Sequence, residues 1–115
     1  MSEKPFLDRS VLRGAATTLV LLILRDTPSY GYQLVQEIRR RSANMFAFGE
    51  GTIYPLLYSL EEDGSIAGRW ETALGGRRRK IYSLTPKGRK RLAAATAEWA
   101  RFEKGMRLAF RGQGA

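Results

Sequence analysis

The stretch that decides the fold is GEGTIYPLLYSLEEDG, which runs from Gly49 to Gly64. Pro55 lacks a backbone N–H and fits only the first turn of a helix, so the helix should begin near Gly51 or Thr52. Gly64 can end the helix by adopting a left-handed conformation after the last turn. At 100° per residue the large aliphatic side chains form one stripe, which consists of Ile53, Leu56, Leu57 and Leu60. The pattern predicts an amphipathic helix with one face in a core.

The opposite face of this helix combines small, polar and aromatic residues, namely Gly51, Tyr54, Pro55, Tyr58 and Glu62. Two tyrosines one turn apart on a face turned to water are unexpected for a helix that only fills a core. We interpret them as residues that contact a binding partner. The alternative is that they pack against a neighbouring element of the same chain.

The composition limits the classes of function. A chain of 115 residues with 43% hydrophobic residues is long enough for one globular domain with a modest core. Cysteine and histidine are both absent, which removes disulfides, thiolate or imidazole metal sites, a cysteine nucleophile and the commonest general base. The acids at 61–63 have no paired acid or base elsewhere, so we expect them on the surface. We expect no catalytic residue, no metal and no cofactor.

The longest apolar run, from Ala15 to Leu24, contains ten residues, whereas a membrane-spanning helix needs about 20. Charged and turn-forming residues follow it at 25–28 in place of a signal-peptide cleavage site. We therefore expect a cytoplasmic protein with no membrane partner.

The formal charge of +9 is concentrated in one segment. Between Arg69 and Arg91 lie nine basic residues and one acid, Glu71, which gives this segment a net charge of +8. The basic residues are Arg69, Arg77, Arg78, Arg79, Lys80, Lys87, Arg89, Lys90 and Arg91. Such a focused field indicates a polyanionic partner. The alternative, a basic face kept for solubility, usually mixes both signs of charge.

Two helices are expected before the Gly49–Gly64 stretch. Asp8 or Ser10 can cap the first, which runs to about Arg25 and becomes apolar on all sides near its end, so that a partner subunit is expected on its second side. Ser29 can cap the second, which runs to about Ser42. With the short connection at 43–49, the second and third helices form a helix-turn-helix pair.

A β-hairpin and a last helix are expected after it. Residues 65–72 alternate in polarity, 74–76 supply a glycine turn, and 80–84 form a second strand whose approach is rich in arginine. We expect Trp70 to pack between the hairpin and the core. Thr85 and Pro86 then provide the cap and first residue of a helix that runs to about Arg111.

The last helix carries an apolar seam with heptad spacing. Leu92, Trp99 and Met106 recur every seven residues, and Ala95, Phe102 and Ala109 follow each by three. A small domain offers no evident cover for this seam. We therefore expect it to form a homodimer.

These elements, in this order, predict a mainly α winged helix-turn-helix fold. Four strings in unbroken order then make the chain similar to the PadR family of bacterial transcriptional regulators: YGYQL at 30–34, GTIYPLL at 51–57, LEEDG at 60–64 and GRRRKIYSLTPKG at 76–88. The similarity extends from about Leu12 to Phe110, and the length with one terminal helix resembles the short subgroup of the family.

The resemblance implies a dimeric DNA-binding repressor whose terminal helices cross between subunits. By this resemblance Tyr32, Thr52 and Tyr54 lie near the DNA, and the run from Arg77 to Lys80 belongs to the wing. Family members often have Arg or Lys where this chain has Ser59, so target preference is expected to differ. Some short members carry, at the position of Trp99, a tryptophan that lines an apolar dimer cavity and binds planar molecules.

Residues 1–84 are thus expected to form a winged helix-turn-helix domain and residues 85–115 a C-terminal dimerisation helix of the same single domain. The expected partners are double-stranded DNA, a second copy of the chain and a planar aromatic effector. Base contacts are assigned to Thr52, Tyr54 and Tyr58, and phosphate contacts to Arg77, Arg78, Arg79 and Lys80. The dimer and effector residues are Leu92, Trp99, Phe102 and Met106. Two alternatives stay open: a winged-helix module that assembles proteins without reading DNA, and a small enzyme, which lacks a catalytic constellation.

Overall fold

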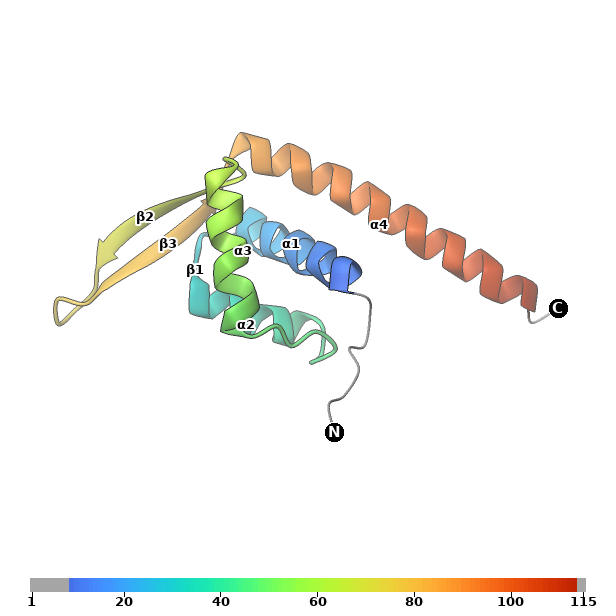
Figure 1. Cartoon of the computed structure of the whole chain (residues 1–115), viewed down its shortest axis with the longest axis horizontal. Coiled ribbons are helices and arrows are strands. Elements are labelled where there is room, and N and C mark those ends of the chain that lie inside the picture. The colour runs from blue at the N-terminus through green and yellow to red at the C-terminus, as the bar shows by residue number, and fades with distance from the viewer. Residues whose placement is uncertain (1–8, 114–115) are drawn as a thin grey trace.

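The computed structural model describes residues 9–113, which form four helices and a small antiparallel sheet (Figure 1). The elements are α1 (Arg9–Asp26), β1 (Ser29–Tyr30), α2 (Gly31–Arg41), α3 (Glu50–Glu62), β2 (Ile66–Thr72), β3 (Arg78–Leu84) and α4 (Pro86–Gln113). The predicted order of elements is confirmed, apart from the additional strand β1. The proposed cap Asp8 lies outside the described residues.

The three-stranded sheet has the order β1-β3-β2, with both strand pairs antiparallel. The prediction that Ser29 caps the second helix is wrong, because Ser29 is buried and pairs with Tyr82 of β3. Tyr30 is the N-cap of α2, and its backbone N–H donates to Gln33 Oε1 at 2.9 Å. The first strand of the sheet thus leads directly into the helix-turn-helix pair.

The core lies where α1, α2 and α3 meet the sheet. All four residues of the aliphatic stripe predicted on α3 are buried. They pack with side chains from the other elements, among them Val20, Leu21, Leu34, Ile38, Ile66, Tyr82 and Leu92. Gly64 has a φ of 83° and ends the turn after α3, as its position in the sequence predicts.

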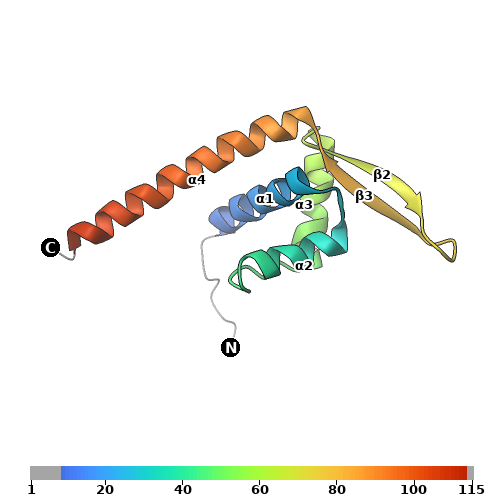
Figure 2. The same ribbon diagram turned by 180° about the vertical axis from the view of Figure 1, so that it is seen from behind.

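Helix α4 begins against the core and then leaves it. Its first half lies beside α1, whereas its far end and the β2–β3 hairpin extend to opposite sides of the helical body (Figures 1 and 2). Leu92 is 4% exposed and belongs to the core of its own chain. The expectation that the seam lacks cover within its own domain is therefore wrong for Leu92. It holds for Phe102 and Met106, which are 57% and 44% exposed.

Within residues 9–113, no helix combines the length and apolar character needed to cross a membrane.

Candidate nucleic-acid interface

The exposed face of α3 carries the side chains that the sequence assigned to base contacts. Thr52 is exposed near the start of the helix, and Tyr54 and Tyr58 are 42% and 69% exposed. The buried stripe on the other face fixes the rotation of α3 about its axis. Tyr54 and Tyr58 therefore share the face opposite the core, whereas Thr52 lies on the flank of α3 nearer α1, where it lines a separate hollow with Arg13 and Phe48.

Tyr54 leans against the start of α2. A Cβ atom built on Gly31 would lie 2.6 Å from Tyr54 Cε1, closer than carbon atoms approach one another. Burial of the Tyr54 hydroxyl raises its pKa. Tyr32, one residue further along α2, is exposed, and its ring stacks on Tyr30 with centroids 6.0 Å apart. The absence of a side chain at Gly31 thus brings α2 and α3 into one aromatic surface.

The β2–β3 hairpin, which we call the wing, places basic side chains beside this surface. Trp70 is 55% exposed, so the expectation that it packs between hairpin and core is wrong. Its ring faces Arg78 Cζ at 5.1 Å and Lys80 Nζ at 5.5 Å from the centroid, because even-numbered residues of β2 and β3 share one face of the hairpin. Cations over aromatic faces are held in place without losing their charge.

Together α2, α3 and the wing enclose a shallow cavity of about 390 Å³. It is lined by aromatic and basic residues, which are Tyr30, Gly31, Tyr32, Tyr54, Trp70, Arg78, Arg79, Lys80 and Tyr82. Five of the predicted DNA-binding residues therefore line this concave surface: Tyr32, Tyr54, Arg78, Arg79 and Lys80. Thr52 lies outside it and lines a hollow against α1. Tyr58 lies one turn further along α3, and Arg77 lies at the hairpin turn.

The four wing cations have different surroundings. Lys80 Nζ forms an ion pair with Glu61 Oε1 at 2.7 Å, which raises the pKa of Lys80. Arg79 Cζ lies 4.1 Å from the centroid of the Tyr30 ring. Arg77 is exposed, and its side chain has no ion pair or ring contact within residues 9–113. The sequence assigned the same role to all four, but Arg77 projects from the wing while Arg78, Arg79 and Lys80 also contact their own chain.

Sequence reasoning missed two participants, Tyr30 and Glu71. The Tyr30 hydroxyl donates to Glu71 Oε1 at 2.6 Å. This bond lowers the pKa of Glu71 and is the largest cause of the raised pKa of Tyr30. One signal was present in the sequence, since Glu71 is the single acid between Arg69 and Arg91.

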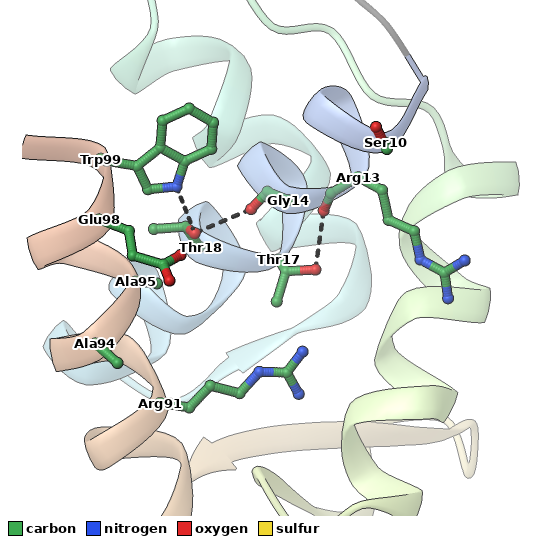
Figure 3. A pocket seen from close by; sticks show the side chains of 10 residues that line it. All are labelled: Ser10, Arg13, Gly14, Thr17, Thr18, Arg91, Ala94, Ala95, Glu98 and Trp99. Carbon is green, nitrogen blue, oxygen red and sulfur yellow. Dashed lines mark hydrogen bonds between the residues drawn. The ribbon is translucent and has the colours of Figure 1, made fainter. Parts of the chain in front are cut away.

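A second candidate site surrounds Trp99, where α4 crosses α1 (Figure 3). The Trp99 indole N–H donates to Thr18 Oγ1 at 2.9 Å, and the Thr18 hydroxyl donates to the Gly14 carbonyl oxygen at 2.9 Å. A cavity of about 490 Å³ opens between the two helices, and its walls include Arg13, Arg91, Glu98 and Trp99. The side chain of Trp99 is thus held within its own protomer.

Trp99 also lines a more apolar cavity of about 320 Å³, together with Leu19, Leu22 and Phe46. Phe102 meets the indole edge to face, with the two rings inclined by 77° and 5.9 Å between centroids. Beyond it, α4 exposes Met106, Leu108 and Phe110. This leaves an apolar strip on α4 next to an apolar hollow over α1.

Among residues 9–113, no group of three or more acidic side chains is placed to hold a metal ion. Two acids at the end of α3 are instead paired with cations, Glu61 with Lys80 and Asp63 with Arg91.

The fold and the basic surface define a class, the winged helix-turn-helix transcriptional regulators. The model of the transcriptional regulator PadR-like family matches residues 20–94. The chain belongs to the PadR-like family and is accordingly a transcriptional regulator and not an enzyme.

Two relatives illustrate the similarity in sequence. Transcriptional regulator Rv3488 of Mycobacterium tuberculosis is 33% identical over 84 residues, which cover 73% of this chain and 75% of the relative. An uncharacterized protein of Lysinibacillus sphaericus is 31% identical over 90 residues, covering 78% and 83% of the two chains.

Solved structures agree with the fold. A transcriptional regulator from Clostridium thermocellum superposes with a TM-score of 0.78 at 29% identity, over 88% of this chain and 95% of that one. A PadR family transcription regulator from Clostridium difficile gives a TM-score of 0.72 at 31% identity, over 83% and 97% of the two chains.

Proposed function

We propose that the protein is a dimeric, sequence-specific DNA-binding repressor that a small-molecule effector releases from its operator. The observation that carries the proposal is the continuity of the exposed face of α3 with the basic wing. A helix that presents Tyr54 beside Arg78 and Arg79, with Tyr58 one turn further along, offers base contacts and phosphate contacts on one surface.

The two elements have different tasks in this proposal. Helix α3 enters the major groove, where hydroxyl groups and aromatic edges reach base edges. The wing lies along the adjacent backbone, where its cations displace counterions. Ser59 is exposed on α3, where many PadR-like chains carry a basic side chain, so one phosphate or base contact is absent and the preferred operator differs.

The dimer is supported by the apolar strip on α4. Phe102 and Met106 project from a helix that continues beyond its own domain, while the hollow formed by Leu19, Leu22 and Phe46 is open on α1. We propose that α4 of each subunit covers the hollow of the other, with Trp99 near the junction. A two-fold dimer reads two half-sites about one DNA turn apart, roughly 34–36 Å.

The effector site is proposed at Trp99. An indole that borders two cavities can stack on a planar aromatic ligand, and an aromatic pair contributes roughly 0.5–1.5 kcal/mol beyond burial. The ligand acts as an inducer only if it binds the DNA-competent subunit spacing less tightly than another spacing.

Fluorescence titration with planar dyes tests whether Trp99 contacts such a ligand, with Trp99→Ala as the variant and Trp70 as the remaining fluorophore. Quenching that persists in the variant reduces Trp99 to a packing residue.

Selection of DNA fragments by the purified protein, followed by affinity measurements at several salt concentrations, tests the function. Arg77→Ala and Arg78→Ala should each lower the slope of log affinity against log salt by about 0.9, because each removes one phosphate contact. Lys104→Ala, the same charge change on α4, should leave the slope unchanged.

Tyr54→Ala should instead reduce the ratio of specific to random DNA binding. A protein that binds no DNA at low salt would be a protein-interaction module, and the proposal would fail.

A further inference from the structure

Glu71 is an acid in a surface built to meet a polyanion, and the structure gives it partners on two sides. Its Oε1 atom accepts the hydrogen bond from Tyr30 Oη at 2.6 Å, and its Oε2 atom pairs with Arg69 Nη2 at 3.2 Å. In the register of the wing, Glu71 lies directly opposite Arg79. The carboxylate is therefore fixed between the wing and the start of α2.

Tyr30 connects this carboxylate to several parts of the surface. Its backbone pairs with Ile81 in the sheet, and the residue is the N-cap of α2. Arg79 lies over its ring at 4.1 Å, and the ring of Tyr32 stacks on it with an interplanar angle of 4°. A single hydrogen bond between residues 41 positions apart thus restrains one wing cation and one aromatic residue of α2 together.

The negative charge of Glu71 is unfavourable in a surface that binds DNA. A carboxylate beside a phosphate backbone repels it, and removing the charge should strengthen binding to any DNA sequence. A group that opposes the partner by charge needs a compensating role. The geometry supplies one, because the acceptor that Glu71 offers to Tyr30 fixes the orientation of groups that face the DNA.

We propose that Glu71 is a positioning residue for the DNA interface, which holds Tyr30 and through it Arg79 and Tyr32 in the arrangement that fits the operator. This inference rests on the proposed DNA-binding function. Glu71 then has two separate effects. Its charge weakens the affinity for any DNA, and its hydrogen bond improves discrimination between operator and random DNA.

The fold does not depend on this bond. A second anchor, the ion pair between Lys80 and Glu61 at 2.7 Å, joins the wing to α3 independently. Tyr30 also keeps its sheet pairing when its hydroxyl is removed. Variants at Tyr30 and Glu71 should therefore retain the wild-type unfolding transition closely enough for binding to be compared.

The experiment compares four variants with the wild type on selected operator and on random DNA: Glu71→Ala, which removes the acceptor oxygen, Tyr30→Phe, the double variant, and Glu103→Ala as the control. Glu103 is an exposed acid on α4, far along the chain from the wing, and its substitution makes the same change of charge and shape. Positioning predicts that Glu71→Ala and Tyr30→Phe each lower the operator-to-random affinity ratio by about fivefold or more, the equivalent of one ordinary hydrogen bond. Glu103→Ala should leave the ratio unchanged.

The double variant provides the sharper criterion. If the bond is the means of positioning, the double variant should lose no more discrimination than either single variant, since both remove the same interaction. Losses that multiply, or a Glu71→Ala protein with an unchanged or higher ratio, would overturn the inference. Amide hydrogen exchange of β2 and β3 without DNA gives a separate readout, in which both single variants should exchange faster than wild type. A wild type that binds no DNA would instead defeat the proposed function itself.

Discussion

Gly31 sets the position of Tyr54 because it has no side chain. The residue is buried at the start of α2, and the ring of Tyr54 occupies the space that a Cβ atom would need. Gly51 on α3 is the opposite case, since a Cβ there would meet nothing within 4 Å. The same substitution should thus have opposite effects at the two positions.

We expect Gly31→Ala to lower the free energy of unfolding by about 1–3 kcal/mol, because it overpacks the contact with Tyr54. Gly51→Ala should raise it by up to about 1 kcal/mol, since alanine is the better helix former. Urea unfolding of both variants measures the difference. Combining Gly31→Ala with Tyr54→Ala should recover part of the loss, and a fully additive double variant would contradict the contact.

Glu37 provides a residue-scale prediction about pH. Hydrogen bonds first from Arg40 and then from Arg41 lower the pKa of Glu37 from 4.5 to about 2. Because the folded-state pKa is depressed, the stabilisation is complete above the unfolded-state pKa and is lost as pH falls from about 5 to 2. Glu37→Gln should therefore flatten the decline in stability over that acidic range. A variant whose unfolding curve follows that of the wild type at every acidic pH would show that the ion pairs do not form in solution.

At the scale of elements, the joint between the sheet and α4 is fixed by one side chain. The Thr85 hydroxyl donates to the Ser65 carbonyl oxygen at 2.8 Å and accepts from the Gly88 N–H at 3.1 Å. Close packing continues at Gly88, where a Cβ atom would lie 2.0 Å from the Ser65 carbonyl oxygen. The direction in which α4 leaves the domain is thus set at its first turn.

Replacing Thr85 by valine should cost about 1–2 kcal/mol of stability, because the isosteric side chain cannot cap the helix. Thr85→Ser keeps the hydroxyl and should cost a few tenths at most. Thermal unfolding of the two variants tests the cap, and equal losses would indicate that the methyl group matters and the hydroxyl does not.

The elements were predictable to the extent that local patterns determine them. The stripe on α3, the glycine turn of the wing and the Thr85–Pro86 start of α4 each lie within a few residues of sequence and were identified correctly. Strand β1 was not, because two residues show no alternation and the strand with which Ser29 and Tyr30 pair, β3, lies more than 50 residues later in the chain.

The residues of the candidate site could also be predicted only where local sequence patterns determine them. The exposed tyrosines of α3 and the arginines of the wing could be assigned from helical periodicity and local charge. The bond between Tyr30 and Glu71 could not, since it depends on strand register and on the angle between wing and α2. Trp70 was misplaced for a different reason: it shares a face of the hairpin with the buried Ile66 and Tyr82, but it lies further along the wing, where the hairpin has extended beyond the core (Figure 1).

At the scale of the whole molecule, the elongated shape bears on the proposed dimer. Its dimensions are 62 × 40 × 22 Å, and the long axis reflects α4 reaching beyond the body of the domain (Figure 1). The part of α4 that reaches out exposes several large apolar side chains, which are Phe102, Met106, Leu108 and Phe110.

We expect the wild type to sediment as a dimer at micromolar concentration and Met106→Glu to sediment as a monomer, because the variant would bury an unpaired charge in the seam. Lys104 lies on the side of α4 away from the seam, so Lys104→Gln makes the same change of net charge without the same burial. That variant should remain dimeric. A monomeric wild type would contradict the proposed assembly, and a dimeric Met106→Glu would place the interface elsewhere.

The glycine turn of the wing has a consequence for the lifetime of the protein. Gly75 and Gly76 both have positive φ, with values of 88° and 82°, and Leu74 beside them is fully exposed. Exposed loop tips of small residues are preferred sites of proteolytic cleavage, and here the peptide bonds that follow Arg77 and Arg78 lie next to the tip. A protease that cuts after arginine would sever the connection between β2 and β3, leaving the wing joined by hydrogen bonds alone. DNA lying along the wing would shield those bonds, so a regulator on its operator would outlast a free one.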